Sequence, residues 1–209
     1  MITVHHLNNS RSQRVLWFLE ELGLEYEIKH YQRDKETNLA PPELMEIHPL
    51  GKSPVIEDGD FKLHETGAIV EYLADTYGKG EFSFERGSKE YLQYLEWMHY
   101  AEGSAMLPLL LGLYTSRLGD GAKPLLPRIA SETKNHFSFM SQRLGENDFF
   151  VGNKFSAADI MLSFPLEAAR ARGVLKAFPN LDAFVGRFQT RLPYLTALER
   201  GGEYAYGPG

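Results

Sequence analysis

The sequence contains no cysteine among its 209 residues. This absence excludes disulfide bonds, thiolate metal sites and every mechanism in which a thiol of the protein is the nucleophile. Any thiol chemistry at this protein must therefore use a thiol that a ligand brings.

Long hydrophobic runs and an excess of positive charge are also lacking. The longest apolar run, around Met106 to Leu113, is broken by Pro108 and Gly112 and is too short to span a membrane. The formal net charge of −6 argues against a general nucleic-acid-binding surface. The first residues, MITVHHLNNS, lack the character of a signal peptide. We therefore expect a cytoplasmic protein with neither a nucleic acid nor a membrane as partner.

The seven histidines do not form a pattern of metal ligands. His5 and His6 are adjacent on a predicted strand, so their side chains point to opposite faces, and the other histidines are scattered. We expect no metal site.

Residues 1–78 have the pattern of a mixed α/β domain. Residues 2–6 and 25–30 resemble strands, and residues 11–22 between them resemble a helix with one apolar face and Gly23 as its stop. A short helical turn, two more strands and a further helix follow. The order βαβ then ββα predicts one mixed sheet with helices on its faces.

The second part of the chain has helical patterns only. Residues 79–87 are rich in glycine and charge and are interpreted as a linker. The predicted helices then cover residues 88–117, 124–144, 156–172 and 181–192. We expect residues 88–209 to form an all-helical domain whose last part, from Leu195, is a tail.

The segment from Lys52 to Ile69 resembles a sheet edge that binds a peptide. Asp58-Gly59 between two short strands predicts a hairpin with a type I′ turn. Pro54 cannot donate to a strand ladder, so it belongs at an edge or in a tight turn, where a cis bond is common. Ser53 before it would then offer its backbone N–H and C=O to an extended ligand.

Glu65 and Thr66 stand where the next helix begins. A ligand carboxylate placed there would meet free N–H groups, the Thr66 hydroxyl and the positive end of the helix dipole, while Glu65 could pair with an ammonium group. An α-amino acid end satisfies both. The alternative is a plain hairpin followed by a helix that Thr66 caps.

The whole chain resembles a cytosolic glutathione transferase. GKSPVIEDGDFKLHETGAIVEYL is similar to the glutathione-site segment of that family, with its cis-proline and its pair of an acidic and a hydroxyl residue. VGNKFSAADIML resembles the family's capping-box helix, in which Ser156 and Asp159 close a buried helix start. By its start, HLNNSRSQRVLWFLEELGL, the chain most resembles the serine-type bacterial and fungal members. The resemblance implies a thioredoxin-like N-terminal domain and an all-helical C-terminal domain.

The resemblance also implies that Ser10 is the catalytic hydroxyl. Serine is no base at neutral pH, but it can donate a hydrogen bond to the sulfur of glutathione and favour the thiolate. The alternative is structural, because Ser10 and Gln13 have the spacing of a capping box. Asn9 and Ser12 are rival candidates for the contact with the thiol.

The remaining site residues are also carried over from the family. Glutathione would be held by Ser10 together with six further residues, namely His48, Lys52, Ser53, Pro54, Glu65 and Thr66. For Lys52 the alternative is an exposed solubilising residue, and for His48 a surface residue. The pocket for the electrophile is expected to include Asn9, Met106 and Tyr114, although most of the aromatic stripe near them is expected to be core.

Three functions remain open at the level of sequence. The first is conjugation of glutathione to hydrophobic electrophiles, with glutathione peroxidase activity on the side. The second is a glutathione-dependent disulfide reductase or isomerase, and the third is a binding protein that keeps the fold without catalysis. The presence together of Ser10, Lys52, Glu65 and Thr66 argues against the third.

A symmetric homodimer is expected from the resemblance, with the first domain of one subunit against the second domain of the other. The sequence adds large apolar residues near the linker that such pairing would bury, namely Phe82, Phe84, Tyr91, Tyr94 and Trp97.

Overall fold

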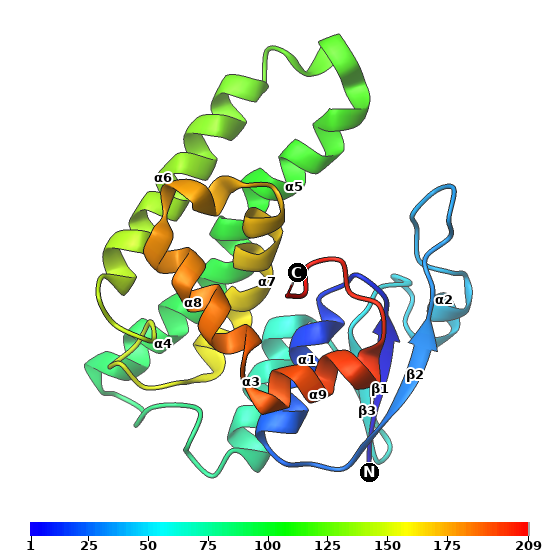
Figure 1. Cartoon of the computed structure of the whole chain (residues 1–209). Helices are drawn as coiled ribbons and strands as arrows, with labels where there is room; N and C mark the ends of the chain where they lie inside the picture. Colours follow the sequence, from blue (N-terminus) through cyan, green and yellow to red (C-terminus); the bar gives the residue numbers. More distant parts are fainter. Residues whose placement is uncertain (209) are drawn as a thin grey trace. The chain divides into compact units, whose positions relative to one another are not determined.

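A computed structural model describes residues 1–208 of the chain (Figure 1). Its contacts divide the chain into two compact units. One consists of Met1–Ser83 with the segment that begins at Phe188, and the other is Phe84–Arg187. The domains expected from the sequence placed everything after the linker in the second domain. In the structure, the segment from Phe188 packs with the N-terminal residues instead.

The N-terminal unit contains one four-stranded mixed sheet. Its elements are β1 (Ile2–Leu7), α1 (Ser12–Glu21), β2 (Tyr26–Tyr31), α2 (Glu43–Ile47), β3 (Val55–Asp58), β4 (Phe61–His64), α3 (Thr66–Tyr77) and, from the end of the chain, α9 (Leu192–Gly201). The strand order is β2-β1-β3-β4, with β1 parallel to β2 and antiparallel to β3, and with β3 antiparallel to β4. The predicted order βαβ then ββα is confirmed.

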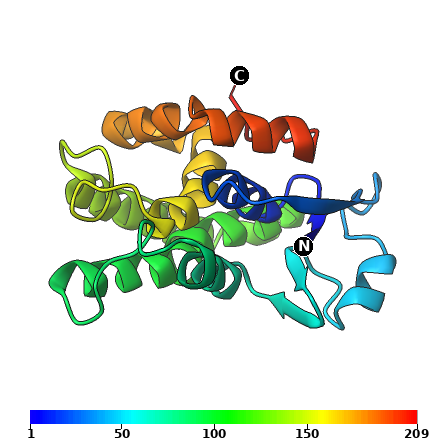
Figure 2. The same cartoon turned by 90° about the horizontal axis from the view of Figure 1, so that it is seen from below.

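Helix α1 is buried because several elements pack around it. It contacts β1, α3 and α9, and Figure 2 shows α9 lying over it. The predicted apolar face is confirmed, since Val15, Phe18 and Leu19 are fully buried. Trp17 is buried as well, and its ring stacks on Phe188. The helix therefore needs apolar side chains on more than one face.

The sequence analysis missed helix α9. It expected a helix that ended at residue 192 and a tail from Leu195. Pro193 lies in the first turn of α9, where a residue without an N–H is tolerated because those N–H groups have no partner within the helix. Tyr194 and Ala197 are buried within this unit. The first part of the segment expected as a tail is therefore helical.

The second unit is helical, as predicted. Its elements are α4 (Lys89–Tyr100), the π-helical turn η1 (Ala101–Ala105), α5 (Met106–Thr115), η2 (Ser116–Ala122), α6 (Leu126–Leu144), α7 (Ala157–Ala171), η3 (Val174–Ala177) and α8 (Pro179–Gln189). Helices α5 and α6 lie side by side, and α7 packs on α4 (Figure 1). The single long helix expected over residues 88–117 is divided by η1.

Two of the aromatic residues expected on an exposed patch belong to the core of this unit. Trp97 is fully buried and its ring contacts Phe139 and Phe150. Tyr94 is 2% exposed. The expectation that a partner subunit buries these two side chains is wrong, because residues of their own chain already bury them.

The start of α7 is closed by the predicted capping box. Asp159 accepts hydrogen bonds from the backbone N–H of Ser156 (2.9 Å) and from the Ser156 hydroxyl (3.1 Å). Its other carboxylate oxygen accepts the backbone N–H of Phe150 at 3.1 Å. Ser156 and Asp159 are both fully buried, so the pair satisfies polar groups that water cannot reach.

The hairpin between β3 and β4 is shifted by one residue from the prediction. Asp58 pairs with Phe61, so the two residues of the loop are Gly59 and Asp60. Gly59 has a φ of 63°, whereas Asp60 has no positive φ. A type I′ turn needs positive φ at both central residues, so the predicted turn with Asp58 and Gly59 at its centre is wrong.

None of the helices within residues 1–208 has both the length and the hydrophobicity that crossing a lipid bilayer requires.

Candidate functional site

The start of α3 carries polar groups that no neighbour uses. Thr66 is the first residue of the helix and is 5% exposed, and Glu65 before it has an unusual backbone with φ 72° and ψ 115°. Within residues 1–208, neither side chain makes a hydrogen bond or an ion pair, and no side chain caps this helix. The alternative in which Thr66 caps its own helix is therefore wrong. The free N–H groups and the Thr66 hydroxyl form a site suited to a carboxylate.

A second set of backbone groups lies at the start of β3. The Ser53–Pro54 peptide bond is cis. The Ser53 hydroxyl donates to the carbonyl oxygen of His5 (2.7 Å) and accepts the N–H of Leu7 (3.2 Å), which fixes Ser53 against β1. The backbone N–H and C=O of Ser53 have no partner among the described residues. They can pair with an extended ligand, as predicted for this edge.

The loop after α2 lies close to the start of α3. The rings of His48 and His64 contact each other with their centroids 3.9 Å apart and their planes tilted by 32°, and His64 directly precedes Glu65. Lys52 in the same loop is exposed and makes no ion pair within the described part of the chain. His48 and Lys52 were predicted from the sequence, but His64 was not. The one feature of the sequence that could have indicated His64 is its position directly before Glu65.

Ser10 lies in the loop between β1 and α1. It is 5% exposed, and its hydroxyl oxygen accepts the N–H of Ser12 at 3.2 Å. The capping box with Gln13 is not formed, because the buried side-chain nitrogen and oxygen of Gln13 have no hydrogen-bond partner in residues 1–208. The alternative in which Ser10 and Gln13 form a capping box is therefore wrong, because the Gln13 side chain does not bond back to the start of the helix.

Ser12, one rival for the thiol contact, has its hydroxyl engaged inside the protein. It is fully buried and lies 2.8 Å from Nδ1 of His6 and 2.7 Å from the Ser10 hydroxyl. Burial lowers the pKa of His6 to about 4, with His30 acting in the same direction and a hydrogen bond to the Gly201 backbone opposing both. His6 is therefore neutral at neutral pH, and its Nδ1 is available to accept the Ser12 proton.

Asn9, the other rival, has a side-chain oxygen that is already bonded. Its Oδ1 accepts the backbone N–H of Ala205 at 2.6 Å. On the other side of the loop, Arg33 donates from Nε to the carbonyl oxygen of Asn8 (3.1 Å) and from Nη2 to that of Asn9 (3.3 Å). Sequence reasoning missed Arg33 and Ala205, because neither belongs to a local motif.

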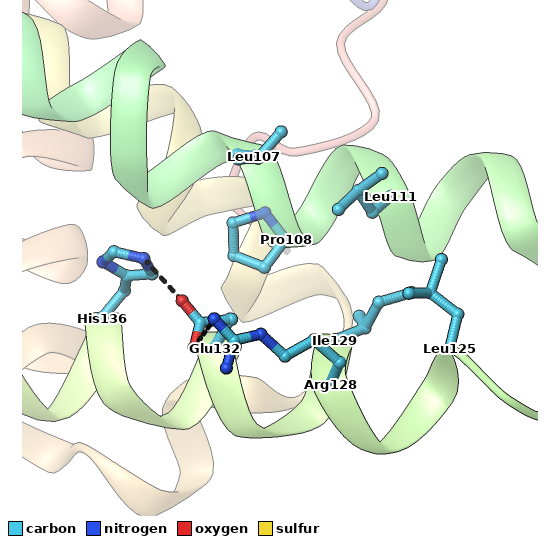
Figure 3. Close-up of a pocket in the computed structure, with 8 residues that line it drawn as sticks. All are labelled: Leu107, Pro108, Leu111, Leu125, Arg128, Ile129, Glu132 and His136. Atoms are coloured by element: carbon cyan, nitrogen blue, oxygen red, sulfur yellow. Dashed lines mark ion pairs between the residues drawn. The ribbon is translucent and has the colours of Figure 1, made fainter.

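The residues expected in the electrophile pocket occupy different environments. Asn9 is half-buried, Met106 is 3% exposed and Tyr114 is 64% exposed. The helical unit also contains a cavity of about 170 Å³ between α5 and α6 (Figure 3). Its lining combines Leu107, Pro108 and Leu111 on α5 with Leu125, Arg128, Ile129, Glu132 and His136. Neither Met106 nor Tyr114 is among these residues.

Residues 1–208 contain no group of three or more His, Asp or Glu side chains placed to hold a metal ion.

Comparisons with known proteins agree on one family. Residues 1–75 match the family model "Glutathione S-transferase, N-terminal domain" and residues 123–200 match "Glutathione S-transferase, C-terminal domain". Glutathione S-transferase 1 of Saccharomyces cerevisiae is 35% identical over 96% of this chain and 95% of its own.

Solved structures of this kind are also similar. A glutathione S-transferase from Actinobacillus pleuropneumoniae has a TM-score of 0.89 at 35% identity and covers 99% of this chain and 95% of its own. A sphingomonad glutathione S-transferase solved in complex with glutathione has a TM-score of 0.77 at 25% identity and covers 96% of this chain and 98% of its own.

Proposed function

Because the chain belongs to the glutathione S-transferase family and is an enzyme of that family, we propose that it binds glutathione along β3 and the start of α3. There it conjugates the glutathione thiolate to hydrophobic electrophiles. The observation that carries this proposal is the unoccupied start of α3, where the Thr66 hydroxyl and the first N–H groups have no partner within the described residues.

The two charged groups on the α-carbon of a γ-glutamyl residue suit this helix start. Its α-carboxylate would accept hydrogen bonds from the Thr66 hydroxyl and from the N–H groups of the first turn, at the positive end of the helix dipole. Its ammonium group would pair with the carboxylate of Glu65, which is exposed and makes no ion pair in residues 1–208. The cysteinyl part would pair with the free backbone N–H and C=O of Ser53, beside Pro54.

The thiol would then be bound by Ser10. A free thiol with a pKa of about 8.5 is only a few per cent ionised at neutral pH. A hydrogen bond from the Ser10 hydroxyl would favour the thiolate, and so would the start of α1. Ser12 is fully buried, whereas Ser10 is 5% exposed, and this difference supports Ser10 as the contact. The Ser10 hydroxyl, which bonds that of Ser12 at 2.7 Å, would turn to the sulfur when glutathione binds. This would make the chain a serine-type member of the family.

The remaining contacts are predictions of the same kind. Lys52 is free to meet the glycine carboxylate of glutathione, and His48 lies in the same loop. The electrophile contacts of Asn9, Met106 and Tyr114 stay predictions.

Glutathione binding measured by calorimetry tests the site. Thr66→Ala should weaken binding at least several-fold, because a charge-assisted hydrogen bond contributes about 1.5 to 3 kcal/mol. Thr76→Ala is the matched control, since Thr76 is exposed at the other end of α3 and should bind as the wild type does. Equal affinity of Thr66→Ala and Thr76→Ala, with both proteins folded, would place glutathione elsewhere.

We also propose a symmetric homodimer. The helical unit exposes several leucines on α5 and around the cavity, including Leu107 (52% exposed), Leu111 (36%) and Leu125 (40%), and self-association is the commonest way to cover such a surface. Light scattering at micromolar concentration should give twice the 23.7 kDa of one chain. A mass of one chain would refute the dimer. It would not argue against the proposed glutathione site, because all residues of that site lie before Lys79.

A further inference from the structure

Asn9, directly before Ser10, has a backbone conformation that side chains rarely adopt. Its φ of 52° is in the left-handed region, where asparagine is tolerated but remains less stable than in the ordinary regions. This dihedral sets the direction in which the chain enters Ser10. Whatever holds Asn9 in this conformation therefore also sets where the Ser10 hydroxyl points.

One of the contacts that hold Asn9 comes from the far end of the chain. The 2.6 Å hydrogen bond described above joins the Asn9 side chain to the N–H of Ala205, which lies in the segment of residues 202–208 after α9. That segment is itself anchored, because Gln189 donates from Nε2 to the carbonyl oxygen of Tyr206 at 3.1 Å. The rings of Tyr204 and Tyr206 also pack against each other, 5.5 Å apart.

Arg33 fixes the same loop from the other side but leaves the Asn9 side chain untouched. Its guanidinium reaches the carbonyl oxygens of Asn8 and Asn9, and its backbone N–H donates to Oδ1 of Asn8 at 2.9 Å. These bonds hold the carbonyl groups of the loop. Within residues 1–208, Ala205 is the partner of the Asn9 amide, so the two anchors act on different atoms.

We propose that Ala205 is a positioning residue for the thiol site. Its N–H holds the Asn9 side chain, Asn9 then keeps its left-handed backbone, and the Ser10 hydroxyl stays where it meets the glutathione sulfur. The segment of residues 202–208 thereby controls how strongly bound glutathione is ionised. The inference rests on the proposed role of Ser10, and it concerns the thiol alone because the glutamyl end would be anchored separately on α3.

A pair of variants at position 205 isolates the N–H group. Ala205→Pro removes this donor, whereas Ala205→Gly keeps it. In Ala205→Pro the thiolate absorbance of the glutathione complex should titrate at a pH higher by roughly half to one unit, which lowers the thiolate fraction at neutral pH by a factor between about 1.5 and 8. Glutathione affinity should change less than about twofold if the α3 anchor is intact. Ala205→Gly should titrate as the wild type does.

Proline could also distort the segment around residue 205, so a second variant changes the other partner of the same hydrogen bond. Asn9→Gly removes the acceptor, yet glycine adopts positive φ without strain, so the loop can still form. It should raise the titration midpoint as Ala205→Pro does, and the double variant should show no further rise, because both changes break one contact. The titration needs no electrophile, and Ala205→Pro leaves the Asn9 side chain in place. A direct contact of Asn9 with the thiol would therefore show as a larger shift in Asn9→Gly than in Ala205→Pro, and that result would count against the role of Ala205.

The outcomes separate this inference from the proposed function. If Ser10→Ala shifts the midpoint but Ala205→Pro and Asn9→Gly titrate like the wild type, Ala205 does not position the site. Additive shifts in the double variant would refute it as well. If Ser10→Ala itself leaves the midpoint unchanged, the assignment of Ser10 has failed, and the role of Ala205 fails with it.

Discussion

Asp159→Ala should lower the free energy of unfolding by roughly 2 to 5 kcal/mol. The substitution removes the carboxylate that accepts hydrogen bonds from two buried backbone N–H groups. The N–H groups of Ser156 and Phe150 both end at this carboxylate, at 2.9 Å and 3.1 Å. Alanine offers neither of them a partner, and the fully buried site admits little water. Denaturant titration of the purified variant measures the loss, and the thermal midpoint should fall with it.

An exposed carboxylate of the same unit is the control. Asp182 pairs with Arg170 at 2.9 Å, but its side chain is 44% exposed. Exposed ion pairs contribute little, so Asp182→Ala should change the free energy of unfolding by less than about 1 kcal/mol. Equal losses in Asp159→Ala and Asp182→Ala would show that the capping box is not what stabilises α7.

The same residue makes stability depend on pH in a defined direction. Burial raises the pKa of Asp159 from 3.8 to about 6, although hydrogen bonds from Phe150 and Ser156 lower it in part. Between these values the folded protein binds more protons than the unfolded chain, so this contribution to stability is complete below pH 3.8 and is lost as the pH rises through 6. Asp159→Asn cannot ionise there. The stability of the wild type relative to Asp159→Asn should therefore decrease from about pH 4 to about pH 7.

Local patterns in the sequence predicted most of the fold because the interactions that decide it are local. The apolar face of α1, with Val15, Phe18 and Leu19, repeats at helical spacing, and the structure buries it. Ser156 and Asp159 are three residues apart, as a capping box requires, and they form one. The hairpin shows the limit, because the Asp58-Gly59 signal marks a turn without fixing which two residues stand at its centre.

Pairings between distant residues account for what the sequence did not show. Arg33 and Ala205 both bind Asn9, yet they are 24 and 196 positions away from it. No periodicity links such residues. The same reason explains α9, whose short apolar face with Tyr194 and Ala197 becomes meaningful only once α1 lies against it.

The glutathione site was predicted by resemblance, and the structure supplies the physical argument for its parts. The unpaired groups of Thr66 could not be read from the sequence, where a threonine at a helix start more often caps its own helix. For Ser10, the sequence left the catalytic and capping roles open. The unpaired side chain of Gln13 decides against the reciprocal cap.

Ser10→Ala should raise the pKa of bound glutathione by about 1 to 2 units, because the thiolate loses a charge-assisted hydrogen bond of about 1.5 to 3 kcal/mol. If the thiol returns to its free pKa of about 8.5, the thiolate fraction at neutral pH, and turnover with it, should fall about eight- to twenty-five-fold. The affinity for glutathione should change less, because Thr66 and Glu65 would hold the glutamyl end on another helix. Absorbance titration of the complex and steady-state rates measure the three quantities.

The pH dependence of this defect distinguishes ionisation from geometry. If Ser10 acts by stabilising the thiolate, the rates of wild type and Ser10→Ala should converge as the pH rises above the thiol pKa of the variant, since both then hold an ionised thiol. Ser10→Thr keeps a hydroxyl and should recover part of the neutral-pH rate. A deficit that stays constant at every pH would mean that Ser10 positions the substrate without ionising it. If Ser12→Ala or Asn9→Ala reproduces the shift and Ser10→Ala does not, the thiol contact belongs to that neighbour.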